Sequence, residues 1–406
     1  MMTFTGATRT PLSVRTCQGN NKMKKIVVSL GAALALIVAS PAQSAPSAPA
    51  AEGVTPREIL IGQNITLEGG KNDYGVAAMD GVQSYLKLVN KTGGVNGRQI
   101  VLKTLDDDNK GAKAEANARQ LVEKDKVFAL FGSIEGGPST AVMKVASELN
   151  VPFFGPMAGS PTLRRPFQPM VFPVRAEHRD EFRALIGHAK SLGIKKFAFL
   201  RVDTDTGLLH LANVRAISKE LGVELVADLP FKPDTTDAQF ANMADELQKT
   251  GAQMMFNHGG IGPYEKVIRA ARAKGVKTAF YGVNSGSAQM VKKMGELSHG
   301  MIFAQVVPSP WERKTAITRE YQDEFSRFKP GQDFSYASLE GYITAKALVA
   351  ALKLAGPNPT REGLVGALQS ATLDINGMPA VYDKANHQGM SFVDLSLVTR
   401  DSKFRH

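Results

Sequence analysis

The stretch Phe128–Thr140 reads Phe-Ala-Leu-Phe-Gly-Ser-Ile-Glu-Gly-Gly-Pro-Ser-Thr, and it decides the fold class. A short apolar run ends at Gly132, a glycine-rich turn follows, and a helix-like stretch begins at Pro138. This is a strand, a loop and a helix, with the loop at the carboxyl end of the strand, where open parallel sheets bind ligands. Free N–H groups at the helix start can hold an anion or a carbonyl group. An ordinary βα turn has the same pattern, so other parts of the chain must distinguish the two.

Predicted strands and helices alternate along most of the chain. Apolar residues recur at helical spacing in some segments and alternate with polar ones in others. Strands are expected near residues 58–66, 99–105, 127–131, 151–154, 171–174, 196–202, 223–229, 253–257, 278–282, 299–306 and within 378–399. Helices are expected near residues 74–90, 112–124, 140–149, 178–192, 207–221, 237–250, 262–274, 286–294, 313–328 and 335–356. This alternation predicts parallel sheets covered on both faces by helices.

The alternation restarts after Val171–Val174 without a Pro/Ser-rich linker. We therefore expect two α/β lobes joined by several crossings of the chain, an arrangement that hinges around a ligand in the cleft. The length of 406 residues, with 43% hydrophobic and 21% charged residues, also favours a globular protein of two domains.

The first 45 residues differ from the rest and read as a secretory signal peptide. Met23-Lys24-Lys25 precedes the apolar run Ile26–Ala39, and small residues around Ser44 suit a cleavage site. The run is too short for a comfortable membrane span. Met23 is the expected initiator, residues 46–55 are an expected disordered lead-in, and the mature protein is expected in the periplasm.

Cysteine usage and charge argue against several classes of function. The only cysteine, Cys17, precedes the apolar run, so the mature chain would have neither a disulfide nor a thiolate metal site. The net charge is +11, of which the first 45 residues contribute five. The chain has no Lys/Arg block with interleaved aromatic residues, so nucleic-acid binding is not expected. His178 and His188 are ten residues apart and no His-x-x-x-His motif occurs, so neither a metal site nor a cofactor is predicted.

Two segments carry the most recognisable motifs. The first is Asn64-Ile65-Thr66-Leu67-Glu68-Gly69-Gly70 with Asp73-Tyr74-Gly75 and Asp80-Gly81, and the second is Asn90–Arg98 followed by Asp106-Asp107-Asp108. They resemble type I periplasmic binding proteins, and more narrowly the branched-chain amino-acid (Leu/Ile/Val) binding proteins of ABC importers. Weaker matches extend the resemblance to most of residues 56–404, at 128–137, 152–155, 172–175, 205–207, 338–342 and 387–389.

The resemblance implies two flavodoxin-like (Rossmann-like) lobes with parallel sheets, joined by a three-crossover hinge near Arg175, Val306 and Gly377. The first lobe would comprise residues 56–175 and 307–376, and the second residues 176–306 and 377–406. It also implies a monomer that hands a small molecule to an ABC permease and its ATPase subunits. No enzyme is expected, because the chain has no Gly-x-Ser-x-Gly elbow, no Walker loop and no Gly-x-Gly-x-x-Gly at a βαβ start.

In amino-acid-binding members of this family, the first lobe holds the ligand carboxylate with a serine and a threonine on successive βα loops. Here those positions fall on Gly136, with Ser133 and Glu135 nearby, and on Gly159, flanked by Ala158 and Ser160. Backbone N–H groups remain, so carboxylate capture is still expected, with the hydroxyl groups displaced by a residue. Ser160 is equally a candidate N-cap for the following residues.

The second lobe departs further from the family. Asn284 stands where an acid takes the ligand ammonium group, and a neutral amide offsets the desolvation of an ammonium poorly. Thr206 replaces a second-lobe aromatic residue, whereas Tyr74 matches the first-loop aromatic or is a packing residue. Arg201 could pair with a ligand carboxylate or with Asp203 or Asp205, and His258 could bond the ligand or pack.

We therefore expect an exported solute-binding component of an ABC importer. Its ligand would be a small carboxylate, aromatic or branched, that lacks the usual ammonium–carboxylate pair. One alternative is an unconventional amino-acid or amide binder that uses Glu135, and another is a protein that presents its ligand to a signalling kinase.

Overall fold

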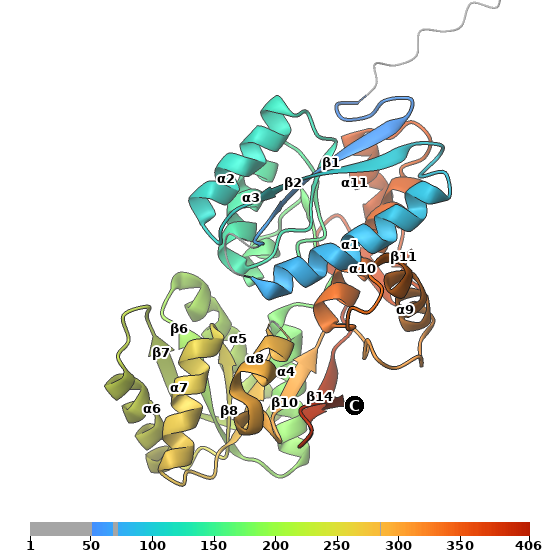
Figure 1. The fold of residues 1–406 in the computed structure, drawn as a ribbon. Coiled ribbons are helices and arrows are strands. Elements are labelled where there is room, and N and C mark those ends of the chain that lie inside the picture. Colours follow the sequence, from blue (N-terminus) through green and yellow to red (C-terminus); the bar gives the residue numbers. More distant parts are fainter. Residues whose placement is uncertain (1–50, 68–71, 285) are drawn as a thin grey trace, which may run out of the picture. The chain divides into compact units, whose positions relative to one another are not determined.

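The computed structural model describes residues 51–67, 72–284 and 286–406 (Figure 1). All of these residues belong to one compact unit, residues 48–406. The predicted signal peptide, the first half of the lead-in (residues 46–50), and residues 68–70 of the first family motif lie outside the described residues. None of the described helices has both the length and the hydropathy that crossing a membrane requires.

Lobe one is built on five parallel strands in the order β2-β1-β3-β4-β5. They are β1 (Glu58–Ile65), β2 (Gln99–Asp106), β3 (Ala129–Phe131), β4 (Phe153–Phe154) and β5 (Val171–Phe172). Helices cover both faces of this sheet, with α1 and α10 on one side and α2 and α3 on the other (Figure 1). These helices are α1 (Asp73–Lys91), α2 (Gly111–Arg119) with a π-helical continuation (Gln120–Lys124), α3 (Gly136–Glu148) and α10 (Tyr336–Leu354).

Two glycines allow α1 and α10 to pack closely. A Cβ atom on Gly81 would lie 1.8 Å from the Ser338 carbonyl oxygen, and one on Gly341 would lie 2.0 Å from the Ala78 carbonyl oxygen. Larger residues at either position would therefore push the helices apart. Lobe one also contains α9 (Ala316–Phe328) and α11 (Arg361–Ser370).

Lobe two is built on seven strands in the order β15-β14-β10-β9-β8-β6-β7. The parallel strands are β6 (Lys196–Val202), β7 (Glu224–Phe231), β8 (Met254–His258), β9 (Ala279–Gly282) and β10 (Ile302–Gln305). The antiparallel strands β14 (Asp394–Val398) and β15 (Phe404–Arg405) extend the sheet beyond β10. The helices are α4 (His178–Ser191), α5 (Asp205–Leu221), α6 (Asp237–Thr250), α7 (Ile261–Ala273) and α8 (Ser287–Met294).

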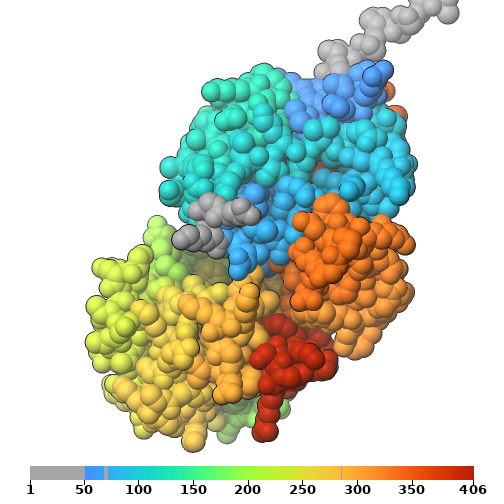
Figure 2. Space-filling model, in the orientation of Figure 1, coloured from blue at the N-terminus to red at the C-terminus, as the bar shows by residue number. Residues whose placement is uncertain are grey.

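The chain passes between the two sheets three times, after β5, after β10 and before β14. A small antiparallel sheet precedes the last passage, with β11 (Leu373–Asp374), β12 (Pro379–Tyr382) and β13 (His387–Gly389). The C-terminal segment then meets residues that follow β10, since Phe404 stacks on Trp311 with ring centroids 5.8 Å apart. In Figure 2 the red C-terminal segment lies beside the orange segment.

The prediction of α/β lobes with parallel sheets is confirmed, with local corrections. Helix α11 was not predicted, because Gly363 and Gly366 weaken its helical pattern although Thr360 caps its first turn. Helix α3 begins at Gly136 rather than near Thr140, and β10 is shorter than the predicted strand. The residue boundaries of the two predicted lobes stay a prediction.

Candidate functional site

Residues that follow the carboxyl ends of strands in both sheets line a cavity of about 850 Å³. This volume suits a small organic ligand. Part of the lining is apolar and comes from both lobes: Ile134, Met157, Val202, Ile261 and Val283. The stretch Phe128–Thr140 contributes to the lining through the loop that joins β3 to α3.

Several helices begin at the cavity wall. Residues of the first turn, or the residue just before it, line the cavity in α1, α3, α4, α5, α7 and α8. In α3, α7 and α8 the residue before the helix forms no side-chain cap, so the first N–H groups are not taken up by a capping side chain. Uncapped N-termini and their dipoles make the cavity favourable for an anion.

The β3–α3 loop presents backbone and one carboxylate to the cavity. Gly136 and Glu135 line it, and Glu135 has φ +62°, a conformation that few residues other than glycine adopt. The Glu135 side chain is exposed and accepts a hydrogen bond of 2.9 Å from Asn72 Nδ2. Ser133 points away from the cavity lining, because it is fully buried and its hydroxyl bonds Ser139 and the Ile134 carbonyl oxygen.

The β4 loop places Ala158 and Ser160 in the cavity wall, but not Gly159. Ser160 precedes a 3-10 turn (Pro161–Leu163) without capping it, and its hydroxyl shares a 2.9 Å hydrogen bond with Thr162. A Cβ atom on Gly159 would lie 2.8 Å from the ring and the backbone nitrogen of His178. The absence of a side chain at residue 159 therefore makes room for His178.

A cluster of buried charged groups, here called the paired cluster, lies where the two lobes meet. Arg175 and Glu181 form an ion pair of 2.5 Å, and Arg175 Nη1 lies 3.6 Å from Glu340 Oε1. All three side chains are at most 1% exposed. Tyr74 donates a hydrogen bond to Glu340, and the Asn284 side chain donates one of 3.1 Å to the same carboxylate. Sequence reasoning identified Tyr74 and Asn284 but not the ionic groups that engage them.

Asn284 is taken up by this cluster. Besides its bond to Glu340, its backbone N–H donates to Glu181 at 2.7 Å, and its side chain is 1% exposed. Asn284 does not line the cavity, whereas Tyr74 does. The Asn284 amide therefore serves the paired cluster and leaves no carboxylate at this position.

The electrostatic balance differs between the two glutamates. Burial alone would raise the pKa of Glu181, but Arg175 and His178 outweigh burial and hold this pKa below its usual range. Burial raises the pKa of Glu340, and the more distant Arg175 offsets burial only in part. Burial and the Glu340 carboxylate also raise the pKa of the Tyr74 hydroxyl well above its ordinary value.

A second buried group, here called the imidazole cluster, consists of His178, His210 and His258, which all line the cavity. The ring centroids of His210 and His258 are 3.8 Å apart, and those of His178 and His258 are 4.7 Å apart. His178 Nδ1 contacts Glu181 at 2.9 Å, but both ring nitrogens of His210 and Nδ1 of His258 have no hydrogen-bond partner. The sequence indicated only His258, since the other two come from α4 and α5.

Burial keeps two of these imidazoles neutral. It lowers the pKa of His210 to about 2 and that of His258 well below its usual value, and the neighbouring histidines contribute in the same direction. Within the described ranges, no group of three or more His, Cys, Asp or Glu side chains is arranged to hold a metal ion. His210 and His258 are therefore neutral hydrogen-bonding groups.

Two other predicted residues lie differently. Thr206 lines the cavity, whereas Arg201 does not. Arg201 is 4% exposed and forms two hydrogen bonds with Asp228, of 2.8 and 2.9 Å, and a contact of 3.5 Å with Asp203. The pairing with Asp203 was one of the predicted alternatives, but the stronger pairing with Asp228 was not foreseen.

Helix α8 adds cations to the cavity rim that sequence reasoning missed. Lys292 and Lys293 line the cavity, and Lys293 pairs with Glu265 at 3.0 Å. Lys292 is exposed and forms no ion pair within the described part of the chain. Its charge is thus available to an anionic ligand, and the sequence signal was a pair of lysines at the end of a short helix.

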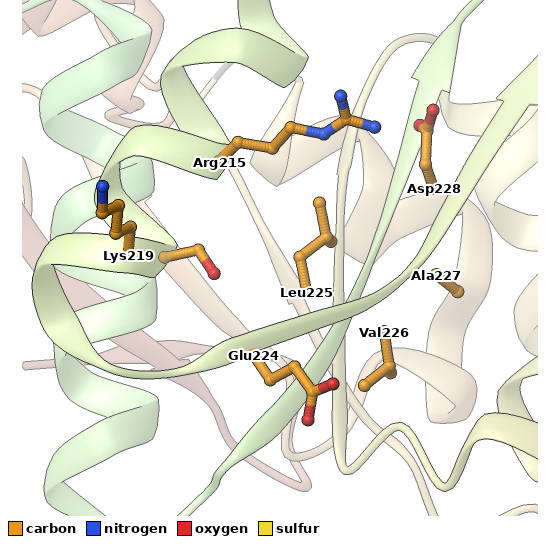
Figure 3. Close-up of a pocket in the computed structure, with 8 residues that line it drawn as sticks. Arg215, Lys219, Glu224, Leu225, Val226, Ala227 and Asp228 are labelled. Atoms are coloured by element: carbon orange, nitrogen blue, oxygen red, sulfur yellow. The ribbon is translucent and has the colours of Figure 1, made fainter.

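Another hollow, of about 340 Å³, lies between α5 and the edge strand β7. Figure 3 shows Arg215 and Lys219 on the helix, with Glu224 and Asp228 on the strand. These charges are of both signs, and no parallel strand directs its carboxyl end into the hollow. The hollow therefore has none of the features that distinguish the larger cavity.

Comparison with known proteins identifies the family. A family model described as periplasmic binding protein matches residues 58–401. Leu/Ile/Val-binding protein homolog 7 of Brucella suis biovar 1 is 22% identical over 345 residues, which are 81% of this chain and 82% of that protein. Homolog 3 of Brucella melitensis biotype 1 is 24% identical over 204 residues, and the match spans only 54% of that relative's length.

The fold is also similar to those of solved solute-binding proteins. The crystal structure of an extracellular ligand-binding receptor from Verminephrobacter eiseniae superposes with a TM-score of 0.75 at 25% identity. The match covers 86% of this chain and 100% of the receptor chain. The predictions of a type I fold and of a binding protein rather than an enzyme are confirmed by these relatives. The chain belongs to the periplasmic binding protein family and has the type I fold, and its relatives include Leu/Ile/Val-binding protein homologues.

Proposed function

We propose that the protein is the exported solute-binding component of an ABC importer and that its ligand is a small carboxylate without an α-ammonium group. In this proposal the signal peptide is removed on export, and the monomer works in the periplasm. The two lobes close over the ligand and present it to a permease with its ATPase subunits. The periplasmic binding protein family and the Leu/Ile/Val-binding relatives support the binding of a small solute as the role.

The observation that best supports an anionic ligand is the set of uncapped helix N-termini at the cavity. The starts of α3, α7 and α8 offer N–H groups that no capping side chain occupies. Lys292 adds a cation that has no partner within the described residues. A carboxylate would satisfy the N–H groups and would gain from the helix dipoles.

The carboxylates near the cavity argue against an ammonium group. Glu181 and Glu340 are buried and engaged by Arg175, and Asn284 carries no charge. The acids that line the cavity, Asp73 and Glu135, are exposed. Burying a polar group without a hydrogen-bond partner costs roughly 2–7 kcal/mol. Burying an ammonium group without a carboxylate partner costs more, because the group is charged.

Glu135 supports a second candidate. Its positive φ places a carboxylate at the cavity beside Asn72, and backbone strain of this kind gathers at ligand sites. An amino-acid or amide binder could use this carboxylate once the lobes close over it. In this alternative, Glu135→Gln would abolish binding of amino acids.

A thermal-shift screen tests the proposal, because a ligand that binds only the folded state raises its stability. We expect 4-methylpentanoate, 3-phenylpropanoate or benzoate to raise the melting temperature, and leucine, isoleucine and valine to have little effect. Strong stabilisation by the three amino acids without stabilisation by the des-amino acids would refute the proposal. Glu135→Gln is the matched variant, since it should leave carboxylate binding unchanged.

A further inference from the structure

The imidazole cluster forms a part of the cavity wall that capture of a carboxylate does not use. His178 is the first residue of α4, His210 lies in α5 and His258 ends β8, so the three rings converge only in the folded lobe. His210 is fully buried, yet neither of its ring nitrogens has a hydrogen-bond partner. Buried polar groups without partners are rare, and they call for a functional explanation.

The surrounding side chains cannot satisfy these nitrogens. The cluster packs against the Phe182 ring, with centroids 5.5 Å from His210 and 6.2 Å from His258. His178 has a polar partner, because its Nδ1 contacts the Glu181 carboxylate, whereas neither ring nitrogen of His210 has one among the described residues. Because a carboxylate accepts hydrogen bonds, that contact makes Nδ1 of His178 the donor.

The loop from the other lobe is shaped around this cluster. Gly159 has no side chain at the one point where a Cβ atom would strike the His178 ring, at 2.8 Å. The His178 backbone N–H donates to the Gly159 carbonyl oxygen at 3.0 Å, which fixes the contact. The ring position is therefore defined by both lobes rather than left to a free surface residue.

The chemistry of the cluster selects a neutral partner. A neutral imidazole offers one N–H donor and one acceptor nitrogen, and a hydroxyl group can meet both. A second carboxylate would lie beside His210 and His258, which carry no charge, and an alkyl group would leave their unpartnered nitrogens unsatisfied once water is expelled. The apolar side chains of Val202 and Ile261 beside the cluster suit the body of such a ligand.

We propose that His178, His210 and His258 recognise a hydroxyl group at the end of the ligand remote from its carboxylate, so that the ligand class is a hydroxylated apolar acid. This inference rests on the proposed function, which supplies the carboxylate at the helix N-termini. It adds a ligand hydroxyl group, which the three histidines of the opposite cavity wall would bind.

Matched pairs of acids test the inference by calorimetry on the full-length protein after export. The pairs are 3-phenylpropanoate with 3-(4-hydroxyphenyl)propanoate, benzoate with 4-hydroxybenzoate, and 4-methylpentanoate with 4-hydroxy-4-methylpentanoate. We expect the hydroxylated member of at least one pair to bind on the order of tenfold to a hundredfold more tightly. Equal affinity within every pair would overturn the inference, and so would the absence of binding by all hydroxylated acids.

Variants assign the preference to the cluster. His210→Phe should remove the preference within the pair while the unhydroxylated acid still binds, and His210→Gln, which keeps a donor and an acceptor, should retain part of it. His299→Gln, on a histidine whose ring nitrogen contacts the Ser402 hydroxyl at 3.3 Å and which does not line the cavity, is the control and should bind as the natural chain does. A preference that survives His210→Phe and the equivalent His258→Phe would overturn the inference.

The outcomes separate this inference from the proposed function. Binding of unhydroxylated acids with no hydroxyl preference leaves the carboxylate proposal intact and refutes the role of the imidazoles. Carboxamides of the same hydroxylated compounds provide the reverse test. If they bind as tightly as the acids, the carboxylate proposal fails while the hydroxyl preference can still be measured.

Discussion

Two buried polar clusters share one contact, His178 with Glu181, and they differ in charge. In the paired cluster, Arg175 lies against two buried carboxylates, although Arg175 Nη1, Glu340 Oε1 and Asn284 Oδ1 have no hydrogen-bond partner among the described residues. In the imidazole cluster, the neutral rings of His210 and His258 lie close together, and three of their nitrogens also have no partner among the described residues. Charged groups are costly to bury and are therefore paired within the chain. Neutral polar groups cost less to bury unpaired, so they can be left to bond a ligand. The comparison separates residues that join the two lobes from residues that we propose to bind the ligand.

The largest expected effect is on the paired cluster. Arg175→Met leaves Glu181 and Glu340 buried without a cation, and breaking a buried pair in this way costs about 3–5 kcal/mol. Equilibrium urea unfolding measures the loss. Arg119→Met, which breaks an exposed pair with Glu148, is the control and should change stability far less. Similar losses in the two variants would contradict the structural role of Arg175.

The pH dependence of stability should separate the two glutamates. The pKa of Glu181 is lowered in the fold, so its carboxylate stabilises the fold above its unfolded pKa, and this is lost as the pH falls through the folded value. The cost of Glu181→Gln should therefore be largest near neutral pH and shrink on acidification. The pKa of Glu340 is raised, so its ionisation disfavours the fold as the pH rises.

For Glu340→Gln we therefore expect the opposite trend, with stability relative to the natural chain increasing as the pH rises above the unfolded glutamate pKa of about 4. Urea unfolding at several pH values gives both trends. Parallel pH trends in the two variants would show that the glutamates are not differentiated as described.

An intermediate effect is expected where the two clusters meet. Gly159→Ala places a Cβ atom 2.8 Å from the His178 ring and backbone nitrogen. Overpacking of this kind costs about 1–3 kcal/mol. Gly137→Ala is the control, because no heavy atom lies within 4 Å of its new Cβ atom. Adding His178→Ala should recover part of the loss, and no recovery would mean that the backbone contact alone causes it.

The smallest effect is expected in the imidazole cluster without ligand. His210→Phe removes two unsatisfied nitrogens from a buried position, so the unfolding free energy should stay the same or rise by about 1 kcal/mol. His188→Phe is the contrast, since its ring nitrogen contacts the Tyr281 hydroxyl at 3.0 Å and the variant should lose about 1 kcal/mol. A clear loss in His210→Phe would show that the ring has a structural partner.

Sequence periodicity was sufficient for most of the fold. The predicted bounds of β1 and α1 agree with the structure within one residue, because alternating and helical spacing are strong in both. Helix α11 was missed since its buried residues, Leu364 and Leu368, are few and two glycines interrupt its pattern. Short strands such as β4 are set by pairing with their neighbours rather than by local sequence.

The site was predictable to the level of loops but not of side-chain direction. Loops after parallel strands must meet at one edge, which is why Glu135, Thr206 and His258 line the cavity as expected. Ser133 and Arg201 lie on correct segments, but their side chains bond within the protein. The directions depend on partners that are distant in sequence, and a sequence pattern of local spacing does not contain them.

The antiparallel strand β14 has a consequence for the order of folding. Its partner β10 ends at Gln305, whereas β14 starts at Asp394, so that edge of the second sheet has no strand to pair with until about 90 further residues have been made. At usual synthesis rates this takes roughly 5–20 s. During that time this edge of β10 is unpaired, and an unpaired strand edge is a template for pairing with another chain.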